Sequence, residues 1–208
     1  MPYQLFDLTQ TLTEATPPYP GDSPFISEQT RFFEADGYVA HEIVAGMHLG
    51  THIDVPMHTV DDKRYIREFP PECFFGKGVM LDVRNEKSID YKKEYEALIQ
   101  AGDIVILYTG CNIHDASYFS SHPLITEAFA DFLIQSKVKI LGMDMPSPDK
   151  PPFPIHKKLL SHDILILENL TNLASLVGVN HFYVSAFPLK INAEGSLVRA
   201  IAITGELP

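Results

Sequence analysis

A short segment between residues 48 and 58 constrains this chain more than any other. It reads His-Leu-Gly-Thr-His-Ile-Asp-Val-Pro-Met-His, so three histidines and one carboxylate fall within eleven residues. Gly50 separates the first two histidines, and Val55 precedes a proline and is therefore biased toward extended backbone. These breaks argue against a continuous helix. We expect the polar side chains to project from a strand end and a tight loop.

Imidazole and carboxylate groups in this density are typical of a divalent-metal site. Zn²⁺ and Mn²⁺ both accept such ligands. Two histidines with one aspartate (His48, His52 and Asp54) would leave coordination positions open for water and substrate, as catalytic sites do. A bound cation lowers the pKa of its water and polarises a carbonyl group, which are the two contributions that amide hydrolysis needs most. A single loop histidine would carry no such prediction.

The remaining composition narrows the class of protein. At 208 residues, one domain over residues 1–208 is expected. The net charge of −11, from 27 acidic and 16 basic residues, argues against nucleic-acid binding, because such binding depends on Lys and Arg at phosphates. Neither a signal peptide nor a membrane-spanning run is visible, so we expect a cytoplasmic protein with no membrane partner. Cys73 and Cys111 are expected to be reduced thiols.

The hydrophobic pattern predicts an α/β fold with a mixed sheet, strand-rich in its first half and alternating between strands and helices in its second. Helices are expected over residues 88–100, after Thr126, over 156–161 and over 171–177. Strands are expected over residues 5–8, 25–33, 38–47, 79–83, 104–108, 138–143, 164–167, 182–187 and 197–204.

Two further polar positions lie far from the first segment. His156 begins the expected helix over 156–161, and Glu168 ends a buried apolar strand, a position from which active-site groups often project. No spacing signal attaches to His114, His122 or His181, which we expect to be structural.

The eleven-residue segment resembles the His-x-Gly-Thr-His-x-Asp-x-Pro-x-His signature of the cyclase family of metal-dependent hydrolases, which includes bacterial kynurenine formamidases and isatin hydrolases. The resemblance covers nearly the whole chain. It implies a compact swivelling β/β/α domain, usually assembled as a homodimer or homotetramer in which a neighbouring chain can complete the pocket. Supporting motifs are Tyr19-Pro20-Gly21-Asp22, Gly102-Asp103 with Thr109-Gly110, Gly142-Met143-Asp144 with Pro146-Ser147, and Ile166-Leu167-Glu168-Asn169-Leu170.

The resemblance implies a metal centre made of two halves. His48, His52 and Asp54 would bind a first ion. In the two-metal members, Asp54 would also contact a second ion together with His156 and Glu168, and Glu168 would bridge both. One or two divalent ions per subunit are therefore expected, with zinc as the first choice and manganese as the alternative.

The resemblance also implies a reaction. His58 would carry a proton to the leaving nitrogen while a metal-bound hydroxide attacks a small amide substrate. The expected activity is arylformamidase-like, converting N-formylkynurenine to kynurenine and formate, and hydrolysis of a cyclic amide of the isatin type is the alternative. The chain contains no tryptophan. Tyr19 stands where the formamidase loop carries a substrate-packing Trp and is the expected substrate-binding residue, since a tyrosine can stack on an aryl ring.

The sequence also admits two other hypotheses. One is a metal-bearing binding protein without catalysis, for which the proton carrier His58 would have no use. The other is a purely structural zinc site, which would make folding depend on the metal.

Overall fold

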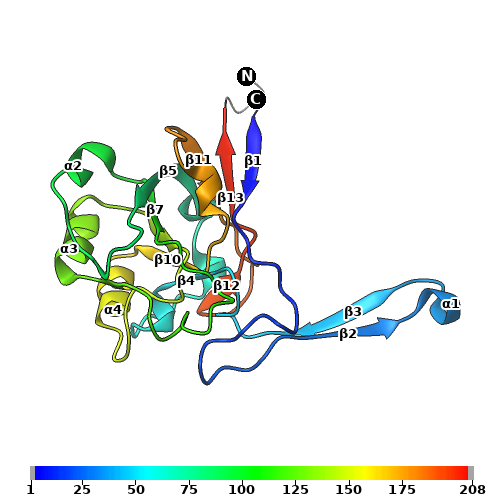
Figure 1. Cartoon of the computed structure of the whole chain (residues 1–208). Coiled ribbons are helices and arrows are strands. Elements are labelled where there is room, and N and C mark those ends of the chain that lie inside the picture. The colour runs from blue at the N-terminus through cyan, green and yellow to red at the C-terminus, as the bar shows by residue number, and fades with distance from the viewer. Residues whose placement is uncertain (1–2, 206–208) are drawn as a thin grey trace.

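The computed structural model describes residues 3–205, and within them a mixed sheet of nine strands forms the centre of the molecule (Figure 1). The strand order across the sheet is β1 (Gln4–Asp7), β13 (Ile201–Thr204), β11 (Phe182–Ser185), β5 (Phe75–Asp82), β7 (Ile104–Tyr108), β9 (Ile140–Met143), β10 (Leu165–Glu168), β4 (His52–Asp54) and β12 (Gly195–Leu197). The α/β expectation with a mixed sheet is confirmed.

The four central strands β5, β7, β9 and β10 run parallel, and the strands on either side of them pair antiparallel. Parallel strands align their carboxyl ends along one edge of the sheet, where open α/β sheets usually bind ligands. Glu168 is the last residue of β10, so it lies at that edge. Antiparallel pairing with β4 places His52 directly opposite Glu168.

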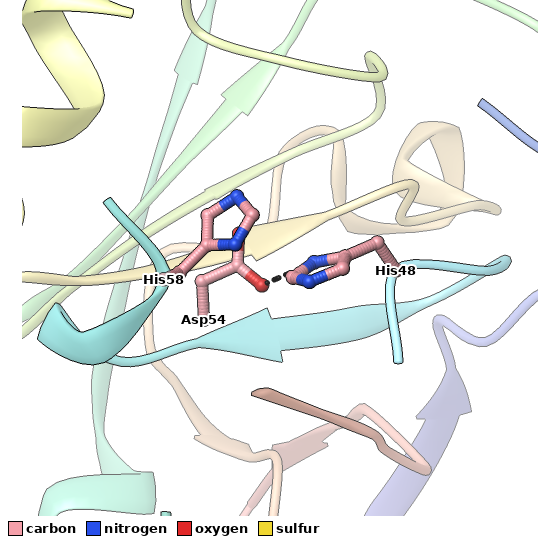
Figure 2. A group of neighbouring side chains, drawn as sticks. All are labelled: His48, Asp54 and His58. Carbon is pink, nitrogen blue, oxygen red and sulfur yellow. Dashed lines mark ion pairs between the residues drawn. The ribbon is translucent and has the colours of Figure 1, made fainter. Parts of the chain in front are cut away.

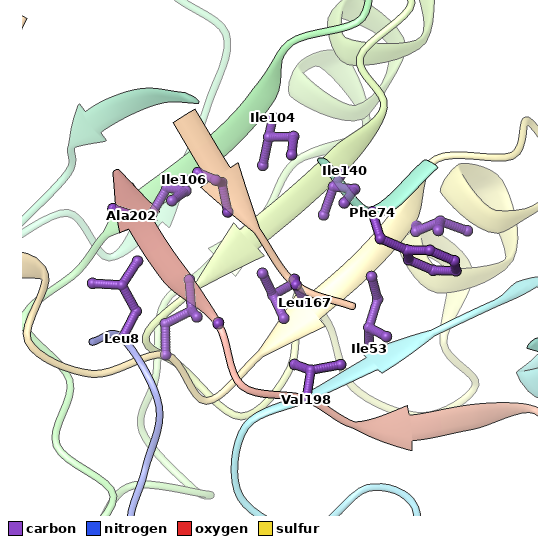
Figure 3. Close-up of a cluster of buried hydrophobic side chains, with 14 of the residues drawn as sticks. Leu8, Ile53, Phe74, Ile104, Ile106, Ile140, Leu167, Val198 and Ala202 are labelled. Atoms are coloured by element: carbon purple, nitrogen blue, oxygen red, sulfur yellow. The ribbon is translucent and has the colours of Figure 1, made fainter. Parts of the chain in front are cut away.

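The two middle strands, β7 and β9, contain no charged residue because both faces of the sheet are covered there. Alternate residues of β7 enter opposite cores: Ile104 and Ile106 pack in one, Val105 and Leu107 in the other. The first core is shown in Figure 3, where Ile53 and Leu167 meet side chains of the flanking strands. The continuous apolar runs of the sequence therefore correspond to buried strands.

Three helices cover the second core on the same side of the sheet (Figure 1): α2 (Tyr95–Leu98), α3 (Glu127–Gln135) and α4 (Pro154–Leu160). Thr126 caps α3 by accepting a hydrogen bond from the backbone N–H of Phe129 at 3.2 Å, as expected. The buried face of α3 is formed by Phe129, Ala130 and Leu133. It is a packing surface.

Short 3₁₀ turns connect the larger elements: η1 (Pro56–His58), η2 (Ile66–Glu68), η3 (Pro71–Phe74) and η4 (Leu173–Leu176). The last of these replaces the longer helix expected over residues 171–177. Cys73 and Cys111 are both free thiols. Among the helices of residues 3–205, none is both long and apolar enough to cross a membrane.

A separate two-stranded hairpin extends away from the sheet (Figure 1). It consists of β2 (Ile26–Arg31) and β3 (Ala40–Val44), joined by the single-turn helix α1 (Phe33–Asp36). The two strands expected in this region are confirmed. Most of their side chains are exposed on both faces, including apolar ones.

Two further expectations about secondary structure are wrong. The segment 88–100 is not one helix: β6 (Ser88–Ile89) pairs with β8 (Leu124–Ile125), and only the last residues form the turn α2. Asp90 also accepts hydrogen bonds from the backbone N–H of Tyr91 and the hydroxyl of Thr126, at 2.8 and 2.6 Å. Strand pairing and this side-chain contact override the helical spacing.

The strand expected over residues 197–204 is likewise two strands. β12 and β13 lie at different places in the sheet, and the residues between them cross from one to the other. The apolar pattern continues through the crossing because Val198 and Ala200 pack into the first core.

Candidate metal centre

The segment 48–58 folds as a turn, a three-residue strand and a 3₁₀ turn. On β4, His52 and Asp54 point to one face while Ile53 enters the first core on the other. Val55 is extended, with φ −113° and ψ 166°, and Pro56 then begins η1, which brings His58 back toward the strand. The expected arrangement on a strand end and a tight loop is confirmed. Gly50 and Pro56, which interrupt regular backbone structure on either side of β4, produce it.

The first half of the centre is formed within the segment 48–58, whose two ends, His48 and His58, lie side by side. Nδ1 of His48 lies 3.0 Å from Oδ1 of Asp54. Figure 2 shows the two side chains facing each other across this ion pair. The rings of His48 and His58 have centroids 4.1 Å apart, and Nε2 of His52 lies 3.6 Å from the same Asp54 oxygen. Ligand atoms of His48, Asp54 and His58 all lie within 4.8 Å of one another. A single ion could contact all three.

The second half is contributed by β10 and α4. Oε2 of Glu168 lies 3.3 Å from Nε2 of His52, and Oε1 lies 3.3 Å from Nε2 of His156. Glu168 therefore stands between the two histidines. His52, Asp54 and Glu168 form a second set of atoms within 4.8 Å, and all three residues are buried. The structure thus brings together the five expected metal ligands and His58.

In two of the histidines, the ring nitrogen that faces away from the centre forms a hydrogen bond. Nδ1 of His52 donates to the carbonyl oxygen of Gly50 at 2.8 Å, and Nδ1 of His156 donates to the carboxylate of Asp149 at 2.6 Å. Each bond places the proton on Nδ1 and leaves the lone pair of Nε2 facing the centre. Histidines that ligate metals are oriented in this way.

Several buried polar atoms of the centre have no hydrogen-bond partner among the described residues. They are Nε2 of His52, both carboxylate oxygens of Asp54 and Oε1 of Glu168. An unsatisfied buried polar atom costs free energy, so a convergent group of them needs an explanation. A divalent cation satisfies nitrogen and carboxylate oxygen atoms at once. The donor set therefore fits a metal of the zinc or manganese type.

The charges of the centre support the same interpretation. Burial acts to lower the pKa of His48 and His156, but the facing carboxylates outweigh it and raise the pKa of His48 to about 9 and that of His156 to about 10. Burial would raise the pKa of Asp54 and Glu168, but the histidines hold both below the usual range. A cation bound at the same atoms would replace the protons that the histidines otherwise hold.

A cavity of about 420 Å³ opens beside the centre. His48, His58, His156 and Glu168 reach its wall, while His52 and Asp54 lie buried beneath it. Tyr19 also lines the cavity, and its ring meets that of Phe119 edge-on with centroids 5.7 Å apart. Further lining comes from Pro17, Pro20, Gly21, Asp22, Gly50, Thr59, Pro146, Ser147, Phe153 and Asn169.

Sequence reasoning missed three polar residues at the centre. Asp149 holds His156, Glu194 places Oε1 3.2 Å from Nε2 of His48, and Asn169 donates to the carbonyl oxygen of Gly50 at 2.9 Å. Asp149 lies seven residues before His156 in a proline-rich loop, a local signal that could have identified it. Glu194 offers no such signal, since it is brought to His48 only by the pairing of β12 with β4.

Comparison with known proteins identifies the family. The family model described as "Putative cyclase" matches residues 6–150. An uncharacterized protein of Methanocaldococcus jannaschii is 37% identical over 206 residues, covering 96% of this chain and 99% of the relative. A kynurenine formamidase of Geobacillus thermodenitrificans is 30% identical over 200 residues, covering 93% and 94%.

Solved structures show the same fold. Isatin hydrolase A from Labrenzia aggregata superposes with a TM-score of 0.86 at 24% identity, covering 98% of this chain and 94% of that one. A structure described as a potential metal-dependent hydrolase with cyclase activity gives a TM-score of 0.80 at 24% identity, covering 99% and 100%. The family model and the curated relatives, together with the donor set described above, define a hydrolase whose centre fits a divalent metal. The chain belongs to the cyclase family.

Proposed function

We propose that this chain hydrolyses the C–N bond of a small aryl formamide, as the kynurenine formamidases that it resembles are named for doing. The observation that carries the proposal is the convergence of unpartnered buried ligand atoms beneath an open cavity. A structural site would have no use for that opening. A divalent ion held there would activate water and polarise the substrate carbonyl.

His48, His52 and Asp54 are the proposed ligands of a first ion, and Asp54, His156 and Glu168 those of a second. The position of Glu168 supports two ions, because its two oxygens face different histidines at the same distance of 3.3 Å. Zinc is the proposed ion and manganese the alternative, since both accept nitrogen and carboxylate ligands.

His58 is the proposed proton carrier. It lies on the cavity wall, its ring centroid is 5.8 Å from that of His156, and its side chain reaches the space that a substrate would fill. Burial lowers the pKa of His58, and the neighbouring His48 and His156 rings add to this. A neutral imidazole can take a proton from water and return it to a leaving nitrogen.

The cavity wall suits a flat, largely apolar substrate. Tyr19, Phe119 and Phe153 present three aromatic rings around it. Aromatic rings pack edge-on or offset against an aryl group, and the phenol of Tyr19 can also form a hydrogen bond. This wall supports an aryl amide over an aliphatic one. Both an open aryl formamide and a fused cyclic amide carry such an aryl ring.

One assay separates the two substrates. Purified protein loaded with zinc should release formate from N-formylkynurenine faster than the His58→Ala variant does. Release no faster than the uncatalysed background would remove the formamidase assignment. Isatin, tested in parallel, would then reveal the cyclic-amide alternative by ring opening, which the likeness to isatin hydrolase makes the second candidate.

Two hypotheses from the sequence are less well supported. A structural zinc site would be needed for folding, yet the apolar cores on both faces of the sheet are built without any ligand residue of the centre. A binding protein without catalysis gives no role to His58 on the cavity wall.

The hairpin of β2 and β3 supports assembly into a homodimer or homotetramer, which we propose. Ile43, Val44 and Phe33 are 61%, 60% and 67% exposed. Glu28 lies directly opposite Glu42, a like-charge pair that weakens the hairpin. An isolated hairpin is marginally stable in water, so packing against a second copy of the chain would stabilise it.

A further inference from the structure

Asn169 occupies an unusual place beside the centre. It directly follows Glu168, it is buried, and its φ of 56° lies in the left-handed region that non-glycine residues rarely adopt. Such a conformation costs free energy and persists where the surrounding structure holds it in place. The contacts of Asn169 must therefore account for it.

Four hydrogen bonds hold this residue, and in one of them its backbone N–H donates to the carbonyl oxygen of Met145 at 3.2 Å. Its amide Nδ2 donates to the carbonyl oxygen of Gly50 at 2.9 Å, and its Oδ1 accepts from the hydroxyl of Tyr118 at 2.7 Å. Its backbone carbonyl accepts from the hydroxyl of Thr51 at 2.7 Å. The end of β10 is thus fastened to the turn that precedes β4, although these segments are more than a hundred residues apart in the chain.

The carbonyl of Gly50 is the shared atom of this network. It accepts from Asn169 and also from Nδ1 of His52, at 2.8 Å. Gly50 has no side chain and a φ of 57°. Its backbone is therefore less restricted than that of another residue, and its carbonyl could turn more freely. The Asn169 amide restrains that carbonyl, and the carbonyl in turn selects which nitrogen of His52 carries the proton.

We propose that Asn169 is a positioning residue for the metal centre. Through Gly50 it directs Nε2 of His52 into the centre, and through its own backbone it fixes the end of β10 that carries Glu168. Tyr118 fixes the orientation of the amide. The inference rests on the proposed metal site, and it assigns a role to two residues that are not themselves proposed ligands. Nδ2 of Asn169 also lies 3.5 Å from Nδ1 of His52, the ring nitrogen that faces away from the centre.

The experiment compares Asn169→Gly with Tyr118→Phe and a matched control. Glycine tolerates the left-handed backbone, so the first variant removes the amide without adding strain. Tyr118→Phe removes only the bond to Oδ1 and tests the same network should the first variant fold poorly. Asn172→Gly is the control, because Asn172 is also left-handed, with a φ of 59°, and donates to a backbone carbonyl, that of Asp7, away from the centre.

Each protein is loaded with Co²⁺, whose visible absorption reports the coordination geometry, and the affinity for Zn²⁺ is measured by competition with a chromophoric chelator. We expect Asn169→Gly to bind Zn²⁺ about 10- to 100-fold more weakly, the usual effect of losing an orienting contact, and to change the Co²⁺ spectrum. Tyr118→Phe should show a smaller loss in the same direction. Asn172→Gly should match the wild type in both.

Two results would overturn the inference in distinguishable ways. Wild-type affinity and spectrum in both Asn169→Gly and Tyr118→Phe would remove the positioning role and leave the metal site standing. Failure of the unmodified protein to take up Co²⁺ or Zn²⁺ would remove the proposed metal site, and the role of Asn169 with it.

Discussion

Asp149 holds the ring of His156 through a 2.6 Å hydrogen bond from Nδ1, and the same carboxylate begins the helix on which His156 stands. Its second oxygen accepts from the backbone N–H groups of Ile155 and His156, at 2.5 and 3.2 Å. A carboxylate at a helix start satisfies backbone donors that have no partner within the helix. Asp149 therefore links the folding of α4 to the direction in which Nε2 of His156 points.

Replacing Asp149 by Asn should weaken the second half of the centre. The amide nitrogen cannot accept a hydrogen bond. Either Nδ1 of His156 or the backbone N–H groups at the start of α4 therefore lose their acceptor. We expect metal affinity to fall about 10- to 100-fold and the free energy of unfolding to fall by about 0.5–2 kcal/mol. Chelator competition and denaturant titration measure the two effects. Asp163→Asn, which makes the same change at an exposed aspartate that pairs with Arg64, is the control, and unchanged affinity in Asp149→Asn would contradict the proposed role.

His58→Ala should separate proton transfer from metal binding. We expect turnover to fall by about 10²- to 10⁴-fold, with the metal content retained, because His58 is proposed to carry protons. Elemental analysis and initial rates measure both on the same sample. Loss of metal together with activity would instead make His58 a ligand, since its ring nitrogen lies within reach of His48 and Asp54. His114→Ala, at an exposed position outside the centre and the hairpin, should behave as wild type.

Tyr19→Ala should impair substrate binding more than chemistry. Loss of an aromatic packing partner costs about 0.5–1.5 kcal/mol, so KM for an aryl amide should rise roughly three- to tenfold while kcat changes less. Tyr19→Phe keeps the ring and its contact with Phe119 and should stay near the wild-type KM. An unchanged KM in Tyr19→Ala would show that the substrate does not contact this wall.

Charge placed on the hairpin should disrupt assembly. We expect the double variant Ile43→Glu, Val44→Glu to have a lower mass by light scattering than the wild type, because burying two carboxylates at an apolar interface is costly. Leu98→Glu changes an equally apolar exposed position on α2 and should leave the mass unaltered. A wild-type mass in the hairpin variant would reject this surface as the contact.

The backbone of the segment 48–58 could be predicted from the sequence because residues within the segment determine its conformation. Gly50 and Pro56 break the backbone where the turn and η1 require it, and Val55 adopts the extended conformation that a following proline favours. Alternation within the apolar strands likewise follows from burial on both faces. His156 and Glu168 were connected to the segment by family resemblance, and the sheet register then explains their position.

Other features depend on contacts that no local pattern contains. The helix expected over residues 88–100 gives way because Ser88 and Ile89 pair with a strand more than thirty residues later. Glu194 and Asn169 reach the centre only through strand pairing and turns. Their roles come from the tertiary fold, and propensity or spacing could not reveal them.

The metal content of the protein tests the central claim most directly. Protein purified without added chelator and dialysed against metal-free buffer should contain near-stoichiometric zinc or manganese by elemental analysis, and a variant that lacks both His52 and Glu168 should lose it. Wild-type protein with no near-stoichiometric divalent transition metal, and none taken up when zinc or manganese is added, would contradict the account.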